Sequence, residues 1–310
     1  MKQIRIATRG SRLAMAQSEY IKRRIEEIAR GVEVVLVTIS TKGDRDQSDF
    51  LYKSQSVGFF TSEVETALLD GRADVAVHSL KDLPTTYAEG LVVAAIPRRE
   101  STADVLVARG GVSSLADLPT GASVGTSSLR RIGQMKHLRR DLNSVPLRGN
   151  VETRVSKVES GQVDAIILAE AGLNRLGLSG KISAVLDCRT FPTAPAQGAL
   201  AVEIRADDAA LAEHIAQIDD RDTRIAAEAE RGILAAMHGG CSIPLGVWSR
   251  VEEDTITLEG TISDVDGNVR IQRNGSAPVQ EAADLARKLA QDLLDGGART
   301  ILARIRQEKR

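Results

Sequence analysis

Short apolar segments rich in β-branched residues alternate along most of this chain with segments of helical periodicity, and this alternation constrains the fold more than any other feature. In the first third of the chain we expect strands at 4–8, 32–40 and 73–79, separated by helices at about 12–30 and near 62–70. Ser62 and Glu65 have the spacing of a capping box at the start of the second helix. Such an alternation is typical of α/β folds.

The alternation starts again after residue 103 and then changes character near residue 220. In the second stretch we expect strands at 103–109, 122–127, 145–148 and 164–169, with helices at about 128–140 and 151–160. The third stretch has a helix near 221–237, alternating segments around 255–261 and 268–273 with a hairpin signal at Asp266-Gly267, and closing helices at about 279–294 and 298–307. The chain is therefore expected to contain two α/β units followed by a smaller α+β unit.

Charge and composition exclude several classes of function. Lysine and arginine number 41 against 42 acidic residues, and aromatic residues make up only 3%, so neither a nucleic-acid surface nor a set of stacking platforms is expected. The N-terminus lacks the apolar core of a signal peptide, and no stretch approaches the ~20 apolar residues of a membrane span, so we expect a cytoplasmic protein. The two cysteines and four histidines have no metal-ligand spacing, so no metal site is expected.

Three predicted helix starts carry arginines where acidic residues are usual. Arg9 and Arg12 flank the expected cap Ser11, while the other two starts contain Arg130 with Arg131 and Arg148 with Arg154. A helix N-terminus is itself partly positive, so added cations make sense there if an anion binds. Each arginine alone is most simply a surface residue, but the three starts together predict a polyanionic ligand at the carboxyl ends of the strands. Arg139 and Arg140 lie at an expected helix C-terminus, and no function is assigned to them.

The Lys81-Asp82 dipeptide and the two cysteines each allow a structural or a functional interpretation. In "VAVHSLKDLP" an apolar strand ends at Ser79, and Lys81 and Asp82 follow at once. The dipeptide alone favours a surface ion pair. Cys188 is most simply a small apolar filler, whereas Cys241 follows a Gly-Gly pair that would let a backbone approach a ligand closely.

Six ordered motifs together resemble one family. The segments "IATRGSRLA", "DVAVHSLKDLP", "GTSSLRR", "LRGNVETR", "DAIILAEAGLNRLG" and "GGCSIPLG" are similar, in order and spacing, to the porphobilinogen deaminase family, also called hydroxymethylbilane synthase. Members condense four porphobilinogen molecules head to tail with loss of ammonia, giving the linear tetrapyrrole hydroxymethylbilane. The resemblance implies three domains, the first two like periplasmic binding proteins. We place them at 1–98 with 199–217, at 103–193 and at 220–310.

The resemblance also implies a cofactor and roles for particular residues. A dipyrromethane would be held by a thioether bond to Cys241, and Asp82 would be the catalytic carboxylate that stabilises cationic pyrroles and mediates proton transfer. Residues implied to bind the cofactor are Lys81, Asp82, Thr126, Ser127, Ser128, Arg130, Arg131 and Arg154. Residues implied to bind substrate and the growing chain are Arg9, Ser11, Gln17, Ser79, Arg148, Gly149 and Arg154.

One segment departs from the family pattern. Residues 41–58 are polar and aperiodic and are expected to form a mobile lid, to which Lys53 and Phe60 would belong. Val57 stands where the family often has a lysine, so the expected lid lacks that positive charge. A solute-binding module of periplasmic type is the alternative function, but such a module would need neither Cys241 nor a third domain. We expect a monomer whose partner is porphobilinogen, with no nucleic acid and no membrane.

Overall fold

The computed structural model describes residues 3–29, 31–41, 62–237 and 243–308. The chain divides into two compact units, Met1–Glu100 with Gly198–Arg224 and Ser101–Gln197 with Ile225–Arg310. The second unit contains both a five-stranded sheet and a separate three-stranded sheet. The finer division into three domains stays a prediction.

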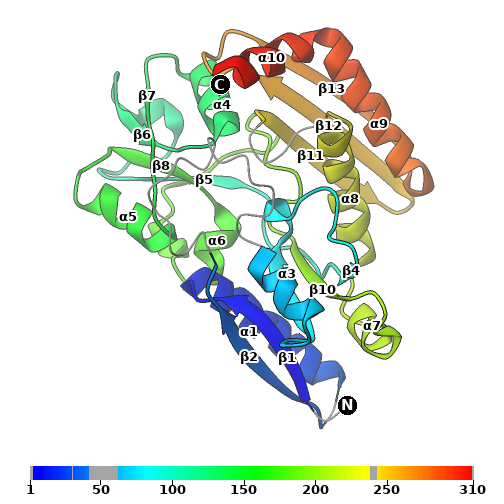
Figure 1. Ribbon diagram of the computed structural model, residues 1–310. Coiled ribbons are helices and arrows are strands. Elements are labelled where there is room, and N and C mark those ends of the chain that lie inside the picture. The colour runs from blue at the N-terminus through cyan, green and yellow to red at the C-terminus, as the bar shows by residue number, and fades with distance from the viewer. Residues whose placement is uncertain (1–2, 30, 42–61, 238–242, 309–310) are drawn as a thin grey trace. The chain divides into compact units, whose positions relative to one another are not determined.

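The first unit is built on a mixed five-stranded sheet with the order β2-β1-β3-β10-β4. β1 is parallel to β2 and to β3, whereas β10 is antiparallel to β3 and to β4. The strands are β1 (Gln3–Arg9), β2 (Glu33–Ile39), β3 (Val75–Ser79), β4 (Leu91–Ala95) and β10 (Leu200–Arg205), and the helices are α1 (Arg12–Ile28), α3 (Ser62–Leu69) and α7 (Ala209–Ala216) (Figure 1).

Both faces of this sheet are covered, because successive side chains of a strand point to opposite faces. Ile21 and Ile25 of α1 pack with Val75 and Val77 of β3 on one face. On the other face Leu68 of α3 packs in a core that includes Ala76. The near-continuous burial of β3 therefore reflects helices on both sides.

The second unit repeats the same strand plan with different segments. Its sheet has the order β7-β6-β8-β5-β9, in which β6 is parallel to β7 and β8, and β5 is antiparallel to β8 and β9. The strands are β5 (Asp104–Ala108), β6 (Ser123–Gly125), β7 (Asn143–Val145), β8 (Ala165–Ala169) and β9 (Ala184–Val185), and the helices are α4 (Leu129–Leu138), α5 (Val151–Glu159) and α6 (Glu170–Arg175). In each sheet the antiparallel strand beside the third parallel strand comes from a distant part of the chain.

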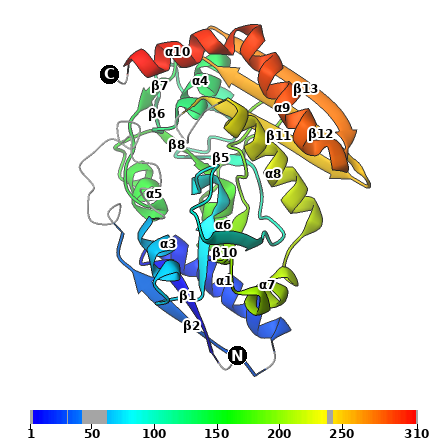
Figure 2. The same cartoon turned by 45° about the vertical axis from the view of Figure 1, so that its right-hand side comes forward.

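The rest of the second unit is an antiparallel sheet of three strands in the order β11-β12-β13, with helices packed on one face. Figures 1 and 2 show α9 lying along β12 and β13. Ile233 of α8, Leu258 of β12 and Leu289 of α9 belong to one core. These elements are α8 (Arg221–Ala236), β11 (Leu245–Glu252), β12 (Thr255–Ser263), β13 (Arg270–Pro278), α9 (Ala282–Leu293) and α10 (Arg299–Glu308).

The structure corrects several expected boundaries. The strand expected at 145–148 is β7, which ends at Val145 because Pro146 has no N–H to donate to a ladder. Residues 264–269 connect β12 to β13, so the connection that contains Asp266-Gly267 lies two residues later than the segments expected around 255–261 and 268–273 imply. α3 is described from Ser62, the first described residue after position 41, so the expected capping box stays a prediction. The expected lid at 41–58 lies outside the described residues, apart from Thr41.

Candidate functional site

In the first unit, four predicted site residues gather at one edge of the sheet. β1 and β3 are parallel neighbours, so Arg9 and Ser79 at their carboxyl ends lie at the same edge. Ser11 caps α1 by accepting a hydrogen bond from the Ala14 N–H at 3.3 Å. Gln17, which is buried, donates its Nε2 to Ser79 Oγ at 2.8 Å and so ties α1 to the end of β3.

Lys81 and Asp82 lie in a short 3₁₀ turn directly after β3, Leu80–Asp82. The turn is anchored by Leu80, whose side chain is fully buried and whose N–H donates to the Ala199 carbonyl at 3.0 Å. Leu83 is also buried, whereas the side chain of Asp82 is exposed. The buried leucines on either side therefore fix the backbone that presents the Asp82 carboxylate to solvent.

In the second unit, two helix N-termini lie at one edge of the sheet. β6 and β7 are parallel neighbours, and α4 and α5 follow them. Ser128 is the N-cap of α4, and Asn150 caps α5 by accepting from the Thr153 N–H at 2.8 Å. Thr126, which is buried, accepts from the Ser128 N–H at 3.3 Å.

The Ser127 hydroxyl makes hydrogen bonds with the backbone of the segment that precedes α5. It donates to the Leu147 carbonyl at 3.1 Å and accepts from the Leu147 N–H at 3.0 Å. The hydroxyl thereby joins the segment that precedes α4 to the one that precedes α5. This contact holds the two helix starts in register with each other.

Arg130 and Arg131, here called the arginine pair, are held by a carboxylate that the sequence did not single out. Asp104, the first residue of β5, is fully buried; its Oδ2 accepts from Arg130 Nη1 and its Oδ1 from Arg131 Nη2, each at 2.7 Å. Gln197 Nε2 also donates to Oδ1, at 2.9 Å. Burial would raise the pKa of Asp104, but attraction to the arginine pair outweighs burial and holds this pKa well below its ordinary value.

Positive charge nevertheless exceeds negative charge in this cluster. Burial lowers the pKa of Arg130 despite Asp104, and repulsion from Arg131 lowers it further. Arg154 is half-buried; burial and then repulsion from Arg131 lower its pKa to about 10. The arginine pair thus shares the Asp104 carboxylate, and the Arg154 guanidinium adds a third positive charge close to Arg131. Such an arrangement favours binding of further negative charge.

Two details show that the cluster can accept an anion. Arg131 Nε is buried and lacks a hydrogen-bond partner among the described residues, so it has an unused donor. Gly149 has φ of +102°, and a Cβ there would lie 2.8 Å from Thr153 Cγ2, so only glycine fits the turn. The Gly149 carbonyl accepts from Arg154 Nε at 2.8 Å, which ties the Arg154 side chain to this turn. The residues present therefore fit a group that carries several carboxylates.

Other predicted residues either flank this cluster or cannot be placed. Arg148 is half-buried in the turn between β7 and α5. Cys241, Lys53 and Phe60 lie outside the described residues. Cys188, expected as a filler, is partly buried, and its Sγ lies 3.6 Å from Thr102 Oγ1.

Sequence reasoning missed Asp104 and Gln197. The available signal was a single acidic residue in the apolar strand "DVLVA", because a buried carboxylate in a strand requires cationic partners. Gln197 gave no comparable signal, since its contacts with Asp104 depend on a turn that the sequence pattern does not specify.

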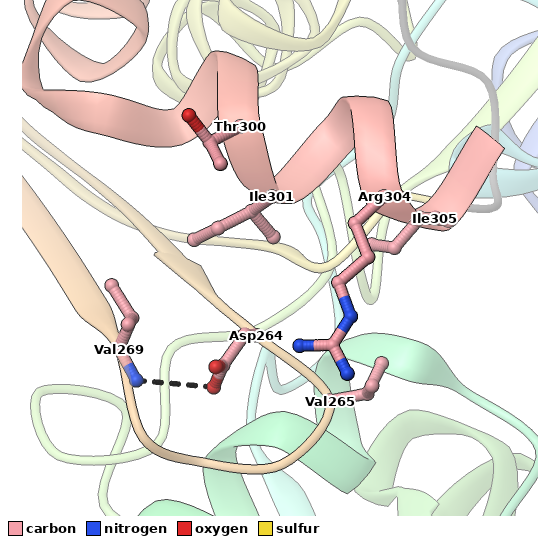
Figure 3. Close-up of a pocket in the computed structure, with 7 residues that line it drawn as sticks. All are labelled: Asp264, Val265, Val269, Thr300, Ile301, Arg304 and Ile305. Atoms are coloured by element: carbon pink, nitrogen blue, oxygen red, sulfur yellow. Dashed lines mark hydrogen bonds between the residues drawn. The ribbon is translucent and has the colours of Figure 1, made fainter. Parts of the chain in front are cut away.

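A pocket elsewhere in the second unit contains none of the predicted site residues. It lies between α10 and the connection from β12 to β13, and Figure 3 shows its lining. The Asp264 carboxylate there accepts from the Val269 N–H at 3.1 Å and so stabilises the connection itself. We assign no chemistry to this pocket.

The described part of the chain has neither a metal-ligand cluster nor a membrane-spanning helix. No group of three or more His, Cys, Asp or Glu side chains suited to a metal ion occurs among residues 3–29, 31–41, 62–237 and 243–308. Within the same residues, no helix combines the length and apolarity needed to cross a bilayer.

Comparison with known proteins gave full-length matches. The family model described as porphobilinogen deaminase, dipyromethane cofactor binding domain, matches residues 4–213, and the one for the C-terminal domain matches residues 224–295. A porphobilinogen deaminase of Nitratidesulfovibrio vulgaris is 48% identical over 310 residues and covers 98% of each chain. That of Maridesulfovibrio salexigens is 46% identical, covering 98% of this chain and 99% of its own. Among solved structures, the periplasmic aliphatic sulphonate binding protein SsuA of Escherichia coli is similar with a TM-score of 0.41 and 18% identity, covering 77% of this chain and 71% of that one.

Proposed function

Because this chain belongs to the porphobilinogen deaminase family, we propose that it is a transferase of tetrapyrrole biosynthesis that condenses four porphobilinogen molecules, with loss of ammonia, into hydroxymethylbilane. The family match does not favour the alternative of a solute-binding module. We also propose that the protein acts as a monomer in the cytoplasm and binds no nucleic acid.

The observation that carries this proposal is the positive charge of the buried arginine pair at the start of α4 together with that of the half-buried Arg154 of α5. Porphobilinogen bears an acetate and a propionate, so a dipyrromethane and the chain that grows on it accumulate carboxylates. Asp104 pairs with both members of the arginine pair, Arg154 adds positive charge close to Arg131, and the unused Nε of Arg131 offers a further donor. A polycarboxylate would neutralise this cluster at the helix N-terminus.

The dipyrromethane, when bound, supplies the pyrrole carbon to which the first substrate is joined. Thr126, Ser128 and the arginine pair would hold its carboxylates, with Arg154 beside them. Ser127 would act through the backbone, since both its hydrogen bonds are to Leu147. Arg148 and Gly149, at the start of α5, would contact the growing chain.

The position of Cys241 along the chain supports its role as the attachment site. In the sequence, Cys241 lies four positions before Leu245, the first residue of β11. Two residues further on, Val247 and Thr193 exchange backbone hydrogen bonds of 2.8 and 2.9 Å. The adjacent Pro192 carbonyl accepts from Arg130 Nη1 at 2.9 Å. The strand that follows Cys241 in the sequence is therefore hydrogen-bonded to the segment that Arg130 contacts.

Asp82 would perform the chemistry in the first unit. Loss of ammonia from a pyrrole leaves positive charge on it, and a nearby carboxylate stabilises that charge and accepts the proton lost after each condensation. Lys81, Arg9 and Ser11 would hold substrate carboxylates at the same sheet edge, and Gln17 would orient Ser79 by the 2.8 Å hydrogen bond.

The experiment is to incubate the purified protein with porphobilinogen. Ammonia release, together with a product that oxidises to a coloured porphyrin, is the expected result. The intact mass should exceed the 33.2 kDa of the bare chain by two linked pyrroles. Turnover by a preparation with the bare mass would contradict the proposed cofactor, and absence of turnover would contradict the function.

A further inference from the structure

The segment that precedes β10 contains a strained turn. The Gln197 N–H donates to the Ala194 carbonyl at 3.0 Å, which closes a four-residue turn with Pro195 second and Ala196 third. Ala196 has φ of +61° and is fully buried. A turn with positive φ at its third position ordinarily has glycine there, because a Cβ makes the left-handed conformation unfavourable. The strain disfavours this turn by about 5- to 30-fold relative to glycine.

A carboxyl group from α8 offsets this strain. Glu230 is buried, and its Oε2 accepts a hydrogen bond from the Ala196 N–H at 2.6 Å. Its Oε1 accepts from Ser249 Oγ of β11 at 2.5 Å, so both oxygens are fixed. A short hydrogen bond from a backbone N–H to a carboxyl group inside the protein stabilises the one conformation that aims the N–H at it. The hydrogen bond to Glu230 therefore holds Ala196 in its strained, left-handed backbone conformation.

The turn determines where the side chain of the next residue, Gln197, lies. Gln197 is buried, and its Nε2 donates to Asp104 Oδ1 at 2.9 Å and to the Thr102 carbonyl at 2.8 Å. Asp104 Oδ1 is the same oxygen that accepts from Arg131 Nη2. A continuous series of hydrogen bonds thus runs from α8, through the strained turn, to the carboxylate that holds the arginine pair.

We propose that Glu230 and Gln197 are positioning residues for the arginine pair. Glu230 keeps the turn at Ala196 in its strained form, the turn directs the Gln197 amide to Asp104, and Asp104 then fixes the two guanidinium groups. Neither residue needs to touch cofactor or substrate in order to act. This inference rests on the proposed function, in which the arginine pair binds the carboxylates of the dipyrromethane.

The strain provides a test that separates positioning from ordinary structural support. Glu230→Met has a similar volume and no acceptor, and we expect it to lower the ratio of holoprotein to apoprotein about tenfold, measured by intact mass. Glu230→Gln keeps an oxygen for Ala196 and an NH₂ for Ser249, so its ratio should stay within about twofold of the wild type. Glu213→Met, an exposed glutamate of α7, is the matched control and should change nothing.

Glycine at position 196 should make Glu230 dispensable. Ala196→Gly alone is expected to load with cofactor like the wild type, and Ala196→Gly combined with Glu230→Met should recover most of the loss, because glycine adopts positive φ without cost. Gln197→Leu should reproduce the loading defect, but Ala196→Gly should not rescue it, since Gln197 acts after the turn.

The outcomes separate the inference from the function on which it rests. If the wild type carries pyrroles and releases ammonia while Glu230→Met loads normally, the positioning role is wrong and the function stands. If Glu230→Met lowers the urea midpoint without changing the loading ratio, Glu230 is only structural and the inference is again wrong. If Ala196→Gly fails to rescue Glu230→Met, the strain argument fails. A wild type with no pyrroles and no turnover overturns the function and the inference together.

Discussion

Asp104→Asn should destabilise the second unit strongly while changing almost none of its shape. The substitution removes one negative charge from a fully buried site that accepts hydrogen bonds from Arg130, Arg131 and Gln197. Two buried guanidinium groups would then lack their counter-charge. Removing one partner of a buried ion pair typically costs about 3–5 kcal/mol. For a unit of this size that corresponds to about 6–20 °C in Tm.

Urea unfolding followed by fluorescence suits this prediction, because the single tryptophan, Trp248, lies on β11 of the same unit. The matched control is Asp284→Asn, which removes an exposed carboxylate paired with Arg287 on the surface of α9. That pair should contribute about 0–1 kcal/mol. Equal unfolding midpoints for Asp104→Asn and Asp284→Asn would refute the argument.

The effect should also depend on pH in a defined direction. The folded pKa of Asp104 is depressed below its unfolded value, so its stabilisation is fully present above about pH 4 and is lost as pH falls further toward the folded pKa. The difference in stability between wild type and Asp104→Asn should therefore be constant near neutral pH and shrink only in acid. A difference that vanished between pH 6 and 8 would point to another titrating group.

Further predictions concern the chemistry. Asp82→Asn should lose about 10²–10³ in single-turnover ammonia release with its cofactor intact, and near-normal turnover would mean that Asp82 is not the catalytic group. Cys241→Ser should give a folded, inactive chain of bare mass; any pyrrole adduct on it would exclude Cys241 as the attachment site. Arg131→Gln should yield mostly apoprotein, whereas Arg148→Gln should yield holoprotein that stalls with fewer pyrroles, and identical mass profiles would refute this division. Citrate binding to the Cys241→Ser protein should weaken as pH rises through about 10, because Arg154 loses its proton there, and Arg154→Gln should abolish that step.

The sequence predicted the α/β class and the parallel strands well, because those strands are buried on both faces and their helices follow at once. It did not predict β10, since "LAVEIR" completes the first sheet from a distant part of the chain and only the tertiary pairing with β3 and β4 identifies it. β4, β9 and β11 were likewise not expected, and the short β9 has too few residues to show a period.

The site was predictable where it depends on local chemistry and not where it depends on tertiary contacts. Arginines beside a helix cap indicate an anion site from the sequence alone, and Ser11, Ser128 and Asn150 do cap their helices. The partner of the arginine pair was not predictable, because Asp104 lies on a different strand. Nor did the sequence show that the Ser127 hydroxyl would make two hydrogen bonds with the backbone of Leu147.

The strand order of the first sheet has a consequence for how the chain can be made. Among the described strands β4 pairs with β10 alone, and β10 also pairs with β3, so residues 1–100 by themselves would leave β4 unpaired and β3 paired on the β1 side alone. The ribosome must therefore deliver the chain to about residue 205 before the first sheet can close, whereas β5 to β9 are all available by residue 185. The N-terminal unit, although translated first, completes its sheet after the sheet encoded downstream, and until then it exposes strand edges that a chaperone would have to shield.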